Sequence, residues 1–119
     1  MVEMAKSVLY VGADGAHSVG RERALVAGGI GVASVIAPEA AVVYVKNLPV
    51  RVVLLDDSAL DVDLSLFAGS LKIARPFLKV VALVSGKRSP QYVDSVLVKP
   101  VPSELLVQVI QGHLELPTA

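Results

Sequence analysis

The chain has 119 residues, no cysteine, and 11 basic against 11 acidic residues, so its formal net charge is zero. The absence of cysteine excludes disulfides, thiolate zinc sites, iron–sulfur clusters and cysteine nucleophiles. The balanced charge argues against a nucleic-acid-binding module, which usually presents a basic face.

The length is that of one domain, and we expect a single domain over residues 1–119 with a folded core at 6–115 and a tail at 116–119. Hydrophobic residues make up 54% of the chain. They occur in runs much shorter than the roughly 20 residues of a membrane span. Residues 1–16 lack the layout of a signal peptide. We therefore expect a cytoplasmic domain without a membrane segment.

Short hydrophobic runs, each closed by polar residues or glycine, predict buried strands. Runs that are apolar almost throughout are typical of strands covered on both faces of a parallel sheet. The predicted strands are Val8–Val11, Val52–Leu55, Val80–Val84 and Val96–Val98, with a weaker fifth at Val32–Ile36.

Helical patterns separate these strands. Helices are predicted for Ser18–Ala27, from Pro38 onward with Ala40, Val43, Tyr44 and Leu48 on one side, for Leu64–Ala74, and from Pro102 onward with Leu105, Leu106, Val109, Ile110 and Leu114 on one face. Because strands alternate with helices, the pattern predicts a doubly wound α/β domain with a parallel sheet between two helical layers.

Polar residues follow the predicted strands. Asp14 lies shortly after the first strand, Asp56 and Asp57 after the third, Ser85 after the fourth and Lys99 after the fifth. The working site of such a fold lies at the carboxyl ends of its strands. A carboxylate there can attack a phosphoryl group, while an ammonium and a hydroxyl bind the phosphoryl oxygens.

Three of these strand ends resemble the hallmark segments of the receiver domains of bacterial response regulators, the CheY-like family. They are Val-Val-Leu-Leu-Asp at 52–56, Val-Ser-Gly at 84–86 and Val-Lys-Pro at 98–100. The resemblance implies the flavodoxin-like receiver fold, with a five-stranded parallel sheet of order 2-1-3-4-5. It also implies a cis peptide bond between Lys99 and Pro100.

The same resemblance implies roles for individual residues. Asp56 would be the phosphoacceptor, and Ser85 and Lys99 would contact the phosphoryl group. Asp57 is one residue away from the matching position, so Asp56 is the better match. The phosphoryl donor would be a sensor histidine kinase.

The sequence also departs from the family pattern. Gly12 and Ala13 stand where receivers carry two acids that help to hold magnesium, which prefers oxygen ligands that include carboxylates. A magnesium site made by Asp14 and Asp56 is therefore expected to be weakened. Thirteen residues separate Ser85 from Lys99, so the fourth helix is expected to be shortened or missing.

Two signalling functions are consistent with these residues, and neither is enzymatic. The domain is either a two-component phosphorelay receiver that accepts a phosphoryl group on Asp56, or a degenerate pseudo-receiver that binds a protein without phosphorylation. Its partner would be a histidine kinase or another signalling protein. The last helix and the trimmed fourth-helix region are a candidate surface for a homodimer.

A third and weaker candidate is a flavin-binding fragment. Asp14, Gly15, Ser18 and Arg21 match the D-G-x-x-S-x-x-R segment of flavoprotein hydroxylases. Those enzymes are several times longer and carry a G-x-G-x-x-G turn at their first strand, which this chain lacks.

The two histidines carry no metal signal. Neither His17 nor His113 has a second histidine or an acid at ligand spacing, and we expect both to be exposed to solvent.

Overall fold

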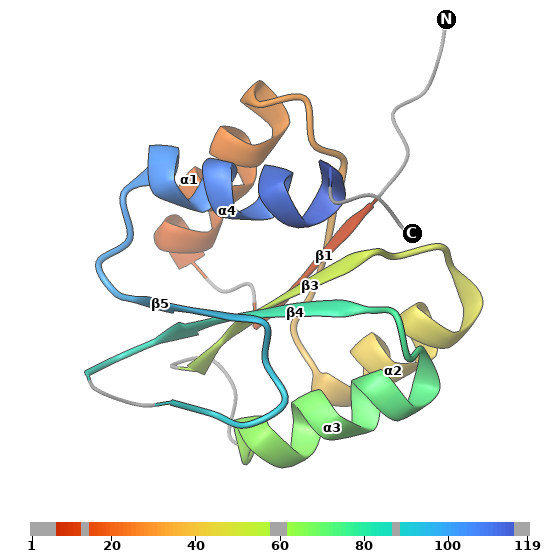
Figure 1. Ribbon diagram of the computed structural model, residues 1–119. Coiled ribbons are helices and arrows are strands. Elements are labelled where there is room, and N and C mark those ends of the chain that lie inside the picture. Colours follow the sequence, from red (N-terminus) through yellow and green to blue (C-terminus); the bar gives the residue numbers. More distant parts are fainter. Residues whose placement is uncertain (1–6, 13–14, 58–61, 87–88, 116–119) are drawn as a thin grey trace, which may run out of the picture.

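A parallel sheet of five strands runs through the centre of the protein (Figure 1). The computed structural model describes residues 7–12, 15–57, 62–86 and 89–115, without the side chains of 15–17. The strands are β1 (Val8–Val11), β2 (Val32–Val35), β3 (Val52–Asp56), β4 (Lys79–Val84) and β5 (Ser95–Val98). The helices are α1 (Gly15–Ala27), α2 (Pro38–Asn47), α3 (Leu64–Ala74) and α4 (Ser103–Glu115).

The strand order is β2-β1-β3-β4-β5, and every neighbouring pair is parallel. This confirms the predicted doubly wound fold and its order 2-1-3-4-5. Helices α1 and α4 cover one face of the sheet, and α2 and α3 cover the other (Figure 1).

Strand alternation gives the domain two hydrophobic cores. Val53 and Leu55 of β3 pack in the core beneath α2 and α3, whereas Val52 and Leu54 pack in the core beneath α1 and α4. All four side chains are fully buried, as expected for a central strand with helices on both sides.

The buried face of α2 differs from the prediction. Ala41 and Val45 are buried, while Val43, expected on the inner side, is exposed. Residues 40–45 are apolar without interruption, so the sequence carries no polar stripe that would identify the outer side. In α4, Leu105 is likewise more exposed than predicted, and Leu106 and Ile110 carry the packing.

The predicted loss of the fourth receiver helix is confirmed for the residues that the structure describes. Between β4 and β5, residues 85–86 and 89–94 form no helix. Asp94 fixes the end of this connection, because its Oδ2 accepts a 2.8 Å hydrogen bond from the backbone N–H of Val80 and a 2.7 Å one from Lys72 Nζ. Hydrogen bonds outweigh the effect of burial here and lower the pKa of Asp94.

The prediction that His113 is exposed was wrong. Its ring is partly buried, and Nε2 lies 2.8 Å from the Ser95 hydroxyl of β5. In the part of the chain that the structure describes, no helix is long and apolar enough to cross a membrane.

Candidate functional site

Two adjacent carboxylates occupy the carboxyl end of β3. Asp56 is the last residue of the strand, and Asp57 follows it. Both are buried, with 5% and 9% of their surface exposed. Asp57 lies just beyond the strand, and the two side chains share Lys99 but differ in their other partners.

Asp56 is held by two cations and a phenol. Arg21 of α1 donates from NH1 to Asp56 Oδ2 at 2.8 Å, and Lys99 donates from Nζ to Oδ1 at 2.8 Å. The Tyr10 hydroxyl accepts a 2.8 Å hydrogen bond from the same Arg21 nitrogen and lies 3.4 Å from Asp56 Oδ2. Burial raises the pKa of Tyr10, against the opposing influence of Arg21, so the hydroxyl keeps its proton at neutral pH.

Asp57 has a different set of partners. Its Oδ2 accepts a 2.8 Å hydrogen bond from the backbone N–H of Ser85, and the Ser85 hydroxyl lies 3.4 Å from Oδ1. Lys99 Nζ lies 2.7 Å from Asp57 Oδ1, so this one ammonium bridges both carboxylates.

The bridging position keeps Lys99 charged. Burial disfavours its ammonium form, but the hydrogen bonds and negative charges of Asp56 and Asp57 outweigh burial and raise the pKa of Lys99. Two carboxylates and two cations thus form a neutral cluster within the described residues, which we call the internal ion cluster: Arg21, Asp56, Asp57 and Lys99.

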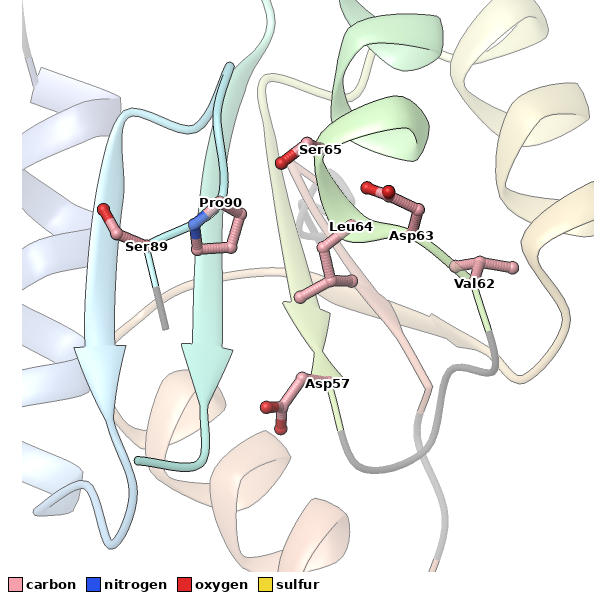
Figure 2. A pocket seen from close by; sticks show the side chains of 7 residues that line it. All are labelled: Asp57, Val62, Asp63, Leu64, Ser65, Ser89 and Pro90. Carbon is pink, nitrogen blue, oxygen red and sulfur yellow. The ribbon is translucent and has the colours of Figure 1, made fainter. Parts of the chain in front are cut away.

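A cavity of about 360 Å³ opens beside Asp57 (Figure 2). Its other lining residues come from the start of α3 and from the β4–β5 connection: Val62, Asp63, Leu64, Ser65, Ser89 and Pro90. Asp56 is not among the residues that line this cavity, so Asp57 is the member of the adjacent pair that faces the open space.

The structure brings some of the predicted site residues together and separates others. Asp56 and Lys99 are in direct contact, as expected, whereas Ser85 contacts Asp57. The Lys99–Pro100 peptide bond is cis, as expected. Asp14 lies outside the described residues.

Two residues of the site were not predicted. Tyr10 was expected to be a core residue, which its complete burial confirms, but its hydroxyl also belongs to the site. Arg21 was noted only as part of the segment that resembles flavoprotein hydroxylases. The position of Arg21 in the sequence could have indicated this role. It lies almost two turns into the helix that follows β1, from which a long side chain can reach the carboxyl ends of the strands.

The described residues at the carboxyl ends of the strands do not form a suitable binding site for a magnesium ion. Gly12 offers no side-chain oxygen, and its φ of 90° is a backbone conformation that favours glycine over aspartate. No three His, Asp or Glu side chains within the described ranges are placed to hold a metal. Arg21 and Lys99 already supply the positive charge next to Asp56, where a divalent cation would meet electrostatic repulsion.

Comparison with known proteins gives structural similarity without sequence similarity. No protein-family model matches the sequence, and no curated protein matches it either. Among solved structures, the CheY-like response regulator receiver domain protein from Methanospirillum hungatei JF-1 aligns with a TM-score of 0.80 and 20% identity over 93% of this chain and 94% of that chain. The beryllofluoride-activated NtrC4 receiver domain dimer aligns with a TM-score of 0.79 and 22% identity, over 91% and 95% of the two chains.

A third structure agrees with these two. The signal receiver domain of a LuxO repressor protein from Vibrio parahaemolyticus aligns with a TM-score of 0.78 and 14% identity, over 91% and 88% of the two chains. All three alignments extend over nearly the whole of each domain. The chain therefore has the fold of the CheY-like receiver domains of response regulators.

Proposed function

We propose that this domain is a signalling module of the two-component type that binds partner proteins without accepting a phosphoryl group. The observation that carries the proposal is the internal ion cluster, in which Arg21 and Lys99 neutralise Asp56 and Asp57. The fold shared with receiver domains supports the signalling role.

The cluster argues against phosphoryl transfer on physical grounds. Phosphoryl transfer to a carboxylate needs nearby cations that are available to offset the charge developing on the phosphoryl oxygens. In Asp56 both oxygens are engaged, one by Arg21 and one by Lys99. Removing one partner from a buried ion pair is strongly unfavourable, because the other charge remains buried without compensation.

Phosphorylation is the second candidate, and a specific observation favours Asp57 as its acceptor. Ser85 and Lys99, which the receiver resemblance implies as the phosphoryl-contacting residues, both lie against Asp57, and the cavity opens beside it. In that case Asp56 and Arg21 would support the site from the side of α1.

Beryllofluoride with magnesium, followed by two-dimensional amide NMR, tests both candidates. We expect no saturable shifts around the ion cluster, while a typical receiver domain measured alongside responds. Saturable shifts that vanish in Asp57→Asn and persist in Asp56→Asn would establish the second candidate. The reverse pattern would restore Asp56 as the phosphoacceptor.

The partner, location and assembly of the module are also proposals. We expect a signalling protein as its partner, the cytoplasm as its compartment, and α4 with the β4–β5 connection, where the fourth receiver helix is trimmed, as the surface of any homodimer. Sedimentation over a range of protein concentrations tests the homodimer, and a monomer at every concentration would contradict it.

A further inference from the structure

The outer side of α3 carries an exposed apolar stripe, which we call the α3 face. It consists of Leu66, Ser70, Ile73, Phe77 and Tyr92. Phe77 and Ile73 are 90% and 84% exposed, and Leu66 and Tyr92 are 71% and 61% exposed. Phe77, Ile73 and Leu66 are the most exposed of the large hydrophobic residues in the described part of the chain.

The Ser70 hydroxyl within this stripe already has a hydrogen-bond partner inside α3. The Ser70 hydroxyl donates a 3.0 Å hydrogen bond to the Leu66 carbonyl one turn earlier in α3. The stripe therefore loses little hydrogen bonding to water when another surface covers it.

Tyr92 is placed on the α3 face by the backbone of the β4–β5 connection. Its φ is 65°, a left-handed conformation that is uncommon for a bulky residue and costs on the order of 1 kcal/mol or more. The ring lies over Gly69, where an added Cβ would meet Tyr92 Cδ2 at 3.5 Å. The aromatic ring of Tyr92 thus rests on α3 and remains largely exposed.

The spacing of the stripe fits a helix. Leu66, Ser70 and Ile73 are separated by four and three residues along α3, and Phe77 adds an exposed aromatic side chain in the turn after the helix, beyond the extended Arg75. Apolar positions in this rhythm form the seam along which one helix packs on another.

The charged residues around the stripe are mainly basic, which favours an acidic partner. Lys72 is the only charged residue within α3, and Arg75 and Lys79 follow it on either side of Phe77. Asp94 pairs with Lys72 at 2.7 Å and lies 4.0 Å from Lys79, while Arg75 NH1 donates a 3.4 Å hydrogen bond to the Val50 carbonyl, so positive charge is in excess among these described residues. A second copy of the same face would bring like charges together, whereas an acidic partner would be attracted.

We propose that the α3 face binds an amphipathic helix of a partner protein, whose apolar side covers the stripe and whose acidic residues flank it near Arg75 and Lys79. The aromatic and aliphatic side chains supply buried area, and the cations supply orientation. The proposal deepens the protein-binding function but does not depend on whether Asp56 or Asp57 is phosphorylated.

Titration with two synthetic helical peptides of about five turns, followed by amide NMR, tests the proposal. Both peptides carry leucines at the seam positions, with flanking glutamates in one and lysines in the other. We expect the glutamate peptide to shift the amides of Ile73, Phe77 and Tyr92 and to bind about tenfold more tightly than the lysine peptide. Added salt should reduce this difference.

Ile73→Glu should abolish binding of the glutamate peptide. Val26→Glu on α1 is the matched control, because Val26 is half exposed and lies on the helix layer across the sheet. Both variants should keep the wild-type amide spectrum away from the mutated site, and Phe77→Ser provides a second, smaller disruption of the stripe.

Equal binding of the two peptides would overturn the proposal, as would shifts that avoid α3 or binding that survives Ile73→Glu. A dimer that sediments as such and is dissociated by Ile73→Glu would assign the face to a second copy and also overturn it. The beryllofluoride experiment is independent, so a phosphorylated domain that still binds the glutamate peptide would contradict only the proposed function.

Discussion

Arg21 of α1 and Asp56 at the end of β3 form an ion pair with 2.8 Å between NH1 and Oδ2. Their side chains are 15% and 7% exposed, so water screens the pair only weakly. With Lys99 on the other oxygen, Asp56 is enclosed by cations that the chain itself provides. The charge that a metal ion offsets in a magnesium-dependent site is offset here by two side chains.

Replacing Arg21 by glutamine should lower the free energy of unfolding by about 3 kcal/mol. The variant leaves Asp56 buried with one cation fewer, which is the costly way to break a buried ion pair. Urea denaturation at neutral pH measures the change. Arg23→Gln is the matched control, because Arg23 is exposed on the same helix and should change stability by less than about 0.5 kcal/mol. A similar small effect of both variants would show that the pair contributes little.

The same Arg21→Gln variant should bind divalent cations more tightly than the wild type. Removing one positive charge leaves the carboxylate pair with a net negative charge, and carboxylates are ligands that magnesium accepts. Manganese, which broadens the resonances of nearby amides, provides the readout in a titration. We expect selective broadening at Asp56 and Asp57 in the variant at concentrations that leave the wild type and Arg23→Gln unchanged. Identical broadening in all three proteins would contradict the role given to Arg21.

The fold was predictable because its strands, apart from the weaker β2, carry a clear hydrophobic signal. Runs such as Val52–Leu55 and Val80–Val84 are buried on both faces, so their hydrophobicity is almost continuous and their ends are sharp. The inner face of α2 was not predictable, because the helix itself carries apolar residues on several of its sides. Only the packing against the sheet and α3 decides that Ala41 and Val45 are buried.

The candidate site was predictable only where residues directly follow strands. The contact of Asp56 with Lys99 follows from the rule that parallel strands end at one edge of the sheet. The reach of Arg21 depends on the length and rotamer of a helical side chain, which hydrophobic periodicity does not encode. The pairing of Ser85 with Asp57 depends on the turn geometry after β3 and β4, which strand patterns also leave open.

Gly12 and Gly20 should respond in opposite ways to substitution by alanine. Gly12 has a φ of 90°, where a Cβ adds strain, so Gly12→Ala should destabilise the protein by about 1 kcal/mol or more. Gly20 lies within α1, and a Cβ added there would meet no neighbouring atom within 4 Å, so Gly20→Ala should stabilise the protein by roughly 0.5–1 kcal/mol. Thermal unfolding of the two variants shows whether each substitution raises or lowers the stability. A stabilising Gly12→Ala would show that the loop after β1 accepts the side chains that receivers carry there.

Acidification should destabilise the domain through His113. Burial lowers the pKa of this imidazole; Asp94 opposes the shift, while Lys79 and Lys72 add to it. Its Nδ1 is buried without a hydrogen-bond partner among the described residues, so the charged ring, which carries a proton on both nitrogens, would hold its Nδ1–H without an acceptor. The folded-state pKa of His113 lies below the ordinary value of 6.5. Between these two pKa values, His113 therefore binds more protons in the unfolded chain than in the folded domain. The stability that depends on neutral His113 is therefore complete above the ordinary value and is lost as the pH falls below it.

Glutamine at position 113 isolates this effect, since its amide can still bond Ser95 but does not titrate. The measurement is the difference in unfolding free energy between wild type and His113→Gln at about pH 7.5 and about pH 5. We expect the wild type to lose stability relative to the variant on acidification, because only the wild type must keep a titratable ring neutral. A difference that is unchanged between the two pH values would mean that the ring takes up its proton as easily in the folded domain as in the unfolded chain. A difference that changes in favour of the wild type would mean that Asp94 outweighs burial and that the folded domain binds the proton more tightly.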